Sequence, residues 1–119
     1  MKLAYVFRTA PHGTAVSREG LDALLAATAF CEEEEIGVFF MDDGVFNLLC
    51  EQKPERILQK DFISALKLLD LYGITQRYVC RQSLVQFGLE TQDCVIDCEK
   101  TDRTVILQQL ARAEKIFTF

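Results

Sequence analysis

Short apolar runs alternate with segments of helical periodicity along this whole sequence. The runs are rich in β-branched and aromatic residues, which is typical of strands that are buried on both faces. Between the runs, leucines recur at the three- and four-residue spacing of an amphipathic helix. Such alternation predicts a parallel or mostly parallel sheet with helices on both faces. We therefore expect an α/β protein of three layers, α/β/α, with five strands.

The strands are predicted at residues 3–7, 36–41, 75–79, 94–98 and 115–119. Helices are predicted between them, with these signals: Ser17 as an N-cap, Pro54 before the clearest stripe of leucines, a brief helix over 82–87, and Thr101 or Asp102 as a cap. Gly73 and Gly88 stand where glycine typically ends a helix. The run Glu32–Glu35 is predicted as a solvated acidic turn.

The length of 119 residues fits one domain, residues 1–119, and is too short for two. Half of the residues are hydrophobic, so the core is large enough to fold without disulfides or a structural metal. The formal net charge of −5 argues against a protein that grips phosphate backbones, so no direct binding of nucleic acid is expected. No apolar run predicts a membrane span or a signal peptide, and a cytoplasmic location is expected.

The five cysteines form no Cys-x-x-Cys pair and are accompanied by a single histidine, His12. In a reducing compartment they are expected to be free thiols. We therefore predict no structural zinc, no other metal and no cofactor.

Three segments fall at the carboxyl ends of predicted strands, where open α/β sheets bind their ligands: residues 9–16, residues 42–44 and Cys80. Cys80 is the most informative, because it lies between the end of a predicted strand and the start of a predicted helix. The free N–H groups and the dipole of that helix would stabilise a thiolate, which suits the uptake and transfer of persulfide sulfur. The alternative is a free cysteine that fills a small apolar gap.

Three further residues are candidates to line such a site. His12 and Thr14 have the chemistry to bind an anion or to orient a thiol, although a loop histidine is also explained by solvation. Asp43, next to Asp42, has the chemistry of a metal ligand, but a turn before Gly44 explains the pair as well.

The sequence lacks motifs that several classes of enzyme require. No Gly-x-Gly-x-x-Gly follows the first predicted strand, and no Gly-Lys-Ser/Thr phosphate loop is present. A phosphoacceptor domain of the response-regulator kind would need acidic residues where this chain has Arg8 and Thr9.

Several stretches together resemble one known family. They are AYVFRTAPHGT at 4–14, REGLDALLA at 18–26, VFF and DGVFNLL at 38–40 and 43–49, QKP at 52–54, KLLDLY at 67–72, and VCRQSL at 79–84 with GL at 88–89. The chain resembles the TusC-type, or DsrF-type, members of the DsrE/DsrF/DsrH sulfur-relay family over nearly its whole length. This resemblance implies a three-layer α/β/α fold and a subunit of a hetero-hexamer with TusB-like and TusD-like chains. Such a complex passes persulfide sulfur to a TusE-like acceptor, toward 2-thiouridine at the tRNA wobble position.

The resemblance leaves two roles open for Cys80. In the family the sulfur-carrying cysteine belongs to the TusD/DsrE-type chain, after its third strand, and Cys80 stands at the corresponding place. The TusC/DsrF type is the non-carrier partner, which implies a structural subunit whose Val45–Cys50 segment and exposed phenylalanines meet the sister chains. The alternatives are a persulfide-carrying sulfurtransferase acting through Cys80, a DsrF-like subunit in sulfur oxidation, and an unrelated domain that binds a small ligand.

Overall fold

The structure, a computed structural model, describes residues 1–11, 15–49 and 56–119, with the side chains of all of these except 56–63. The site candidates His12 and Thr14 lie outside the described residues, as does Cys50.

A sheet of five parallel strands forms the middle layer, in the order β4-β3-β2-β1-β5. The strands are β1 Leu3–Phe7, β2 Ile36–Phe40, β3 Arg77–Cys80, β4 Glu99–Thr101 and β5 Lys115–Thr118. Every residue of β2, the central strand, is buried. The predicted α/β architecture is confirmed.

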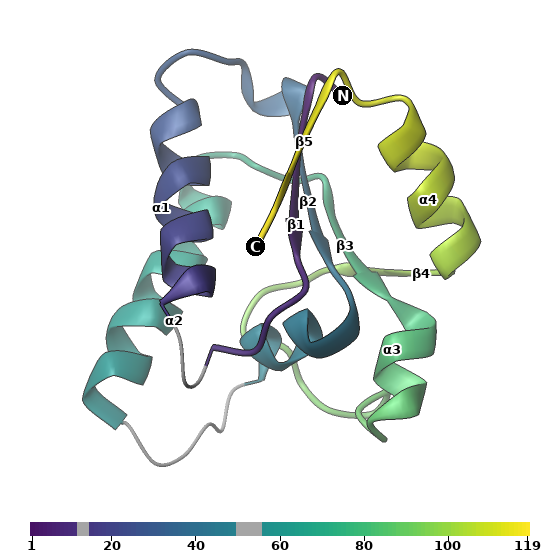
Figure 1. Ribbon diagram of the computed structural model, residues 1–119. Helices are drawn as coiled ribbons and strands as arrows, with labels where there is room; N and C mark the ends of the chain where they lie inside the picture. Colours follow the sequence, from purple (N-terminus) through teal and green to yellow (C-terminus); the bar gives the residue numbers. More distant parts are fainter. Residues whose placement is uncertain (12–14, 50–55) are drawn as a thin grey trace.

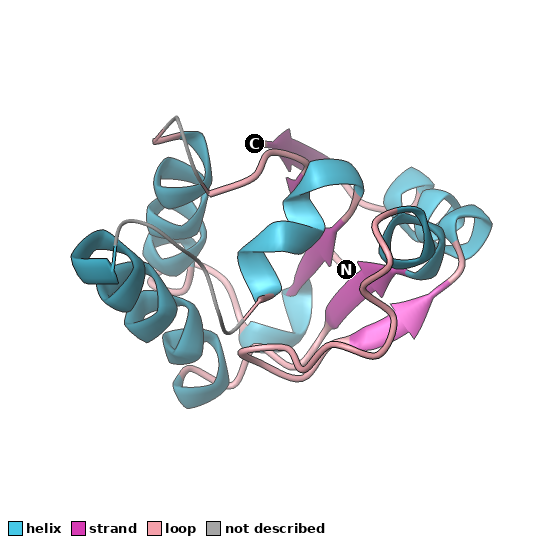
Figure 2. Ribbon diagram, turned by 90° about the horizontal axis from the view of Figure 1, so that it is seen from below, coloured by secondary structure: helices cyan, strands magenta, loops and turns pink. Residues whose placement is uncertain are grey.

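Helices cover both faces of the sheet. They are α1 Val16–Ala27, α2 Arg56–Leu71, α3 Arg81–Gln86 and α4 Arg103–Ala111, with the 3₁₀ helices η1 Glu33–Glu35 and η2 Asp42–Leu48. Helices α1 and α2 lie on one face and α4 lies on the other, while α3 follows β3 directly (Figure 1). The layers separate clearly when the molecule is turned by 90° (Figure 2). Among the described residues, no helix is both long enough and apolar enough to cross a membrane.

The alternation of side chains along each strand divides the core into two clusters. Tyr5 and Phe7 of β1 point to the α1/α2 face, where they pack with Leu21 and Leu24. The smaller cluster on the α4 face contains Ala4, Val6, Phe39, Met41, Cys80 and Ile106. Cys80 is therefore packed between the sheet and α4.

Two local predictions are wrong. Residues 94–98 are not a strand; Cys94 makes one isolated antiparallel bridge to Leu49, and the fourth strand is Glu99–Thr101. The apolar residues of this segment, such as Ile96, pack on the α1/α2 cluster from irregular backbone, which produced the strand-like pattern. Ser17 lies inside α1, and its hydroxyl donates to the carbonyl of Thr9 instead of capping the helix.

The interaction surface expected at Val45–Cys50 is available only in part where the structure describes it. Val45 and Leu48 in η2 are fully buried in the protein's own core, so they are not available to a sister chain. Phe46 and Leu49 of the same segment are partly exposed, so the expected contact is limited to these two positions.

Candidate functional site

The carboxyl ends of the strands bring distant parts of the chain together, because all five strands are parallel. Arg8 follows β1, Asp42 follows β2, Cys80 ends β3, and Asp102 follows β4 at the start of α4. These residues define what we call the carboxyl edge.

Cys80 is fully buried, with an exposed fraction of 0%. Its side chain belongs to the apolar cluster on the α4 face, beside Ile106 of α4. The Sγ–H donates a long hydrogen bond to Oε1 of Gln82, with 3.8 Å between the two atoms. The thiol thus stands at the predicted strand–helix boundary but is closed off from solvent, as a cysteine that fills an apolar gap would be.

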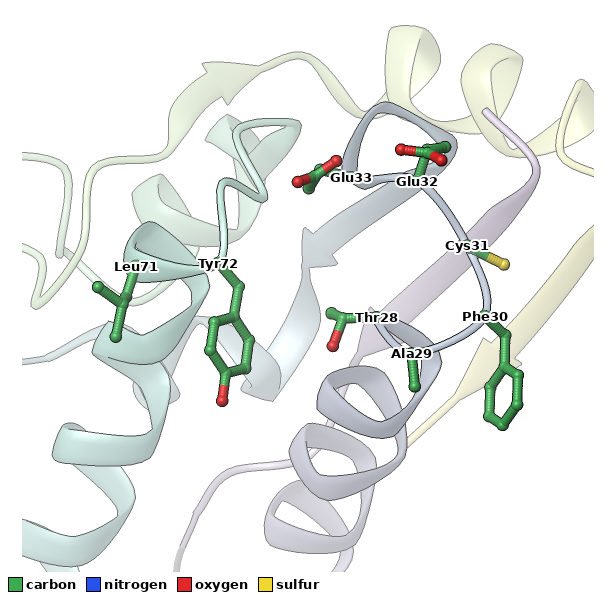
Figure 3. A pocket seen from close by; sticks show the side chains of 8 residues that line it. All are labelled: Thr28, Ala29, Phe30, Cys31, Glu32, Glu33, Leu71 and Tyr72. Carbon is green, nitrogen blue, oxygen red and sulfur yellow. The ribbon is translucent and has the colours of Figure 1, made fainter.

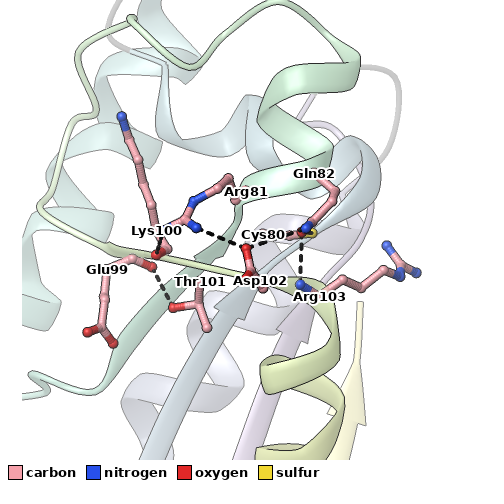
Figure 4. Close-up of polar contacts among 8 residues, drawn as sticks. All are labelled: Cys80, Arg81, Gln82, Glu99, Lys100, Thr101, Asp102 and Arg103. Carbon is pink, nitrogen blue, oxygen red and sulfur yellow. Dashed lines mark hydrogen bonds and ion pairs between the residues drawn. The ribbon is translucent and has the colours of Figure 1, made fainter.

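Gln82 joins the start of α3 to the start of α4 beside this thiol (Figure 4). Its Oε1 also accepts the backbone N–H of Arg103 at 2.8 Å, and its Nε2 lies 3.4 Å from Oδ1 of Asp102. Arg81 donates to the same Asp102 oxygen at 2.9 Å and to the carbonyl of Lys100 at 3.0 Å. The starts of α3 and α4, residues 81–82 and 102–103, therefore cover Cys80 and are held together by several polar contacts. We call these residues the cover.

Asp42 anchors this cover to β1 and β2. Its Oδ1 accepts from Nη1 of Arg103 at 2.8 Å, and its Oδ2 accepts from Nε of Arg8 at 2.7 Å. The hydrogen bond from Arg103, reinforced by Arg8 against partial burial, lowers the pKa of the Asp42 carboxyl, and the same contact raises the pKa of Arg103. A carboxylate held by two guanidinium groups is not a free metal ligand.

The backbone of Asp42 is also unusual. Its φ is 52°, in the left-handed region that non-glycine residues rarely adopt, and its N–H donates to the hydroxyl of Ser83 at 2.9 Å. The two guanidinium groups and the serine hydroxyl hold it in that conformation.

At this turn the sequence predicts Asp43 as a site residue, but the structure places Asp43 at the surface, outside these contacts. Sequence reasoning missed Gln82, Arg103 and the role of Asp42, because their contacts span 21 to 61 residues along the chain. The available signal was charge: Arg8 and Asp42 follow adjacent parallel strands, so their side chains were placed to meet.

The loop after β1 packs tightly against η2. A Cβ on Gly44 would lie 1.8 Å from the carbonyl oxygen of Phe7, so only glycine fits at this position. The amide of Asn47 donates to the carbonyls of Thr9 and Gly44, both at 2.9 Å. The carboxyl edge is built on a closely packed backbone.

The remaining described cysteines lie away from Cys80 and form no disulfide. Burial raises the pKa of the Cys98 thiol to about 12, which keeps it protonated and unreactive at neutral pH. Cys31 lies at the opposite edge of the sheet, after α1.

Comparison with known proteins places the chain in a family. The model of the DsrE/DsrF-like family matches residues 1–119. Proteins named "Protein TusC homolog" from Haemophilus influenzae and Pasteurella multocida are each 58% identical over 119 residues, covering both chains completely. One from Vibrio parahaemolyticus is 49% identical over 118 residues, covering 99% of this chain and 98% of its own.

The ychN protein from E. coli has a crystal structure with the same fold. Its TM-score is 0.77 at 24% identity, and the match covers 100% of this chain and 99% of that one. With the family model and full-length relatives in agreement, the chain belongs to the DsrE/DsrF-like family, on its TusC-type branch.

Proposed function

We propose that this chain is a structural, interaction subunit of a TusBCD-like sulfur-relay complex. Its partners are TusB-like and TusD-like sister chains in a hetero-hexamer, which delivers persulfide sulfur to a TusE-like acceptor. The end product is 2-thiouridine at the tRNA wobble position. The net charge of −5 fits a subunit that does not itself bind the tRNA.

One observation carries this proposal: the thiol is covered while large apolar side chains are not. Cys80 is completely buried. In the described part of the chain, eight large hydrophobic residues are well exposed, namely Phe30, Leu71, Tyr72, Val85, Val105, Leu107, Ile116 and Phe117. Two of these, Ile116 and Phe117, lie on β5, which is an edge strand of the sheet. Exposed apolar side chains and an open sheet edge are typical of a chain that buries surface against partners.

Co-expression with TusB-like and TusD-like chains tests the assembly. We expect one hetero-oligomer that contains this chain on size exclusion and in native mass spectrometry. The variant Cys80→Ser should assemble equally well and keep the 2-thiouridine content of tRNA at the wild-type level. A stable monomer that elutes apart from the sister chains would overturn the proposal. Normal 2-thiouridine in a strain without this chain would instead favour the sulfur-oxidation alternative.

A second candidate is a persulfide carrier, favoured by the place of Cys80 at the carboxyl edge directly before α3 and beside Gln82. In that reaction the Cys80 thiolate attacks the terminal sulfur of a donor persulfide, the donor's S–S bond breaks, and the donor leaves as a thiolate. The new S–S bond makes Cys80 a persulfide, which adds about 32 Da, the mass of one sulfur atom. Intact mass after incubation with a persulfide donor separates the roles. An adduct that disappears in Cys80→Ser supports the carrier, and its absence supports the structural subunit.

A further inference from the structure

A groove opens at the amino ends of the strands, on the opposite edge of the sheet from Cys80. It lies between the end of α1 and the end of α2 and has a volume of about 490 Å³ (Figure 3). Its lining residues are Thr28, Ala29, Phe30, Cys31, Glu32, Glu33, Leu71 and Tyr72. We call this feature the amino-edge groove.

The apolar side chains of the groove are unusually open to water. Phe30 is 88% exposed, Leu71 is 75% exposed and Tyr72 is 43% exposed. These are three of the eight large hydrophobic residues that stand out from the described surface, and they come from two helix ends that are about 40 residues apart in sequence. Figure 3 shows Tyr72 directed between the two helix ends, while Phe30 and Leu71 point outward on either side of the groove. The three side chains therefore form an exposed apolar rim, and such side chains are typical anchor points of protein interfaces.

The groove is also strongly acidic. Both charged residues that line it are glutamates, and ligand oxygens of Glu32, Glu33 and Glu34 lie within 4.8 Å of one another. No described lysine or arginine forms an ion pair with Glu33 or Glu34. Like charges held this close repel one another, so a cationic group brought to this place is attracted.

We infer that the amino-edge groove is a docking site for a basic amphipathic segment of a partner protein. Apolar side chains of that segment cover Phe30, Leu71 and Tyr72, and its lysine or arginine side chains meet Glu32–Glu34. This inference rests on the proposed function, since it assigns one partner contact of the subunit to a defined surface.

A synthetic peptide of about 14 residues tests this chemistry, with leucines at helical spacing and lysines elsewhere. Fluorescence anisotropy measures its affinity for the full chain. Cys31 lines the groove, so its rate of alkylation, followed by peptide mapping, reports whether the synthetic peptide occupies the groove. We expect binding below about 1 mM, slower alkylation of Cys31, and a loss of affinity of about tenfold in Phe30→Ser/Leu71→Ser and in Glu33→Gln/Glu34→Gln.

Matched controls remove equivalent groups elsewhere on the surface. Val85→Ser/Leu107→Ser and Glu19→Gln/Glu90→Gln should change the affinity by less than about twofold. Equal losses in the controls would show a non-specific charge effect and overturn the inference, as would the absence of binding. A wild-type dimer that becomes monomeric in Phe30→Ser/Leu71→Ser would overturn it in favour of a second copy of this chain. Assembly with the sister chains is measured in a separate experiment. Failure of peptide binding can therefore be distinguished from failure of the proposed assembly.

Discussion

The two edges of the sheet differ in how far the chain satisfies its own side chains. At the carboxyl edge, Asp42 and Asp102 are paired with arginines, and the thiol of Cys80 is covered. At the amino edge, Phe30 stands almost wholly in water and the glutamates that follow it have no described cationic partner. The carboxyl edge carries Cys80, the candidate nucleophile, but shields it from solvent. The amino edge instead leaves large apolar side chains exposed.

This difference bears on the proposed role of the chain as a subunit. A nucleophile must be reached by its substrate, so a sealed thiol needs a movement before it can react. When a partner covers an exposed aromatic residue, the complex is stabilised by roughly 25 cal/mol for each Å² of apolar surface removed from water. The chain alone is therefore better prepared for assembly than for sulfur transfer.

The largest effect is expected from Gly44→Ala at the carboxyl edge. Its Cβ would lie 1.8 Å from the carbonyl oxygen of Phe7, so the backbone must move, at a cost of about 3 kcal/mol or more. Gly73→Ala beside the amino-edge groove meets only the side chain of Glu33 at 3.5 Å, and its φ of 76° costs about 1 to 2 kcal/mol. Urea unfolding compares the two variants. Equal losses would contradict the contrast between a tightly packed edge and an open one.

A smaller effect is expected from Asp42→Asn, which weakens the contacts of Arg8 and Arg103 that hold the cover over Cys80. We expect a loss of about 1 to 2 kcal/mol in the free energy of unfolding and an increase of about tenfold in the rate at which iodoacetamide alkylates Cys80. Peptide mapping identifies the modified cysteine. Asp43→Asn makes the same charge change one residue away and should leave the rate unchanged. If both variants react at the wild-type rate, Asp42 does not fasten the cover.

The same pair predicts a pH dependence. The pKa of Asp42 is lowered in the folded protein, so its contribution is fully present above the unfolded value of about 3.9 and is lost as pH falls through the folded pKa. The difference in stability between wild type and Asp42→Asn, about 1 to 2 kcal/mol at neutral pH, should shrink below about pH 4. Chemical unfolding at a series of pH values measures it. A difference that stays constant into acid would show that the charge on Asp42 contributes nothing.

The smallest effect on stability is expected from Leu71→Ser at the open edge. The side chain is 75% exposed, so the free energy of unfolding should change by less than about 0.5 kcal/mol. Leu69→Ser, at a fully buried position on the same helix, should cost several times more. Thermal unfolding distinguishes the two. A large loss in Leu71→Ser would mean that this leucine belongs to the chain's own core.

The fold was largely predictable because most of its strands and helices have a local sequence pattern typical of their secondary structure. Four of the five strands lie where the apolar runs placed them, and α2 ends before Gly73 as predicted. The error at residues 94–98 has a physical cause: burial selects apolar residues in an irregular segment as strongly as in a strand.

The candidate site was predictable only in part. The position of Cys80 before a helix follows from the local pattern, but its burial depends on Gln82, Ile106 and Arg103, which meet it only through the tertiary fold. The amino-edge groove left no local signal, since Phe30 and Leu71 each stand at a helix end. The glutamates beside Phe30 were expected to form nothing more than a solvated turn.

Hydrogen–deuterium exchange on the chain, free and mixed with the TusB-like and TusD-like chains proposed as its partners, tests the contrast between the two edges most directly. Assembly should slow exchange in the backbone amides of residues 29–34 and 71–73 and leave those of residues 80–84 and 102–106 unchanged. Protection confined to residues 80–84 and 102–106, with the amino-edge groove still exchanging at its free rate, would contradict the assignment of docking to the open edge.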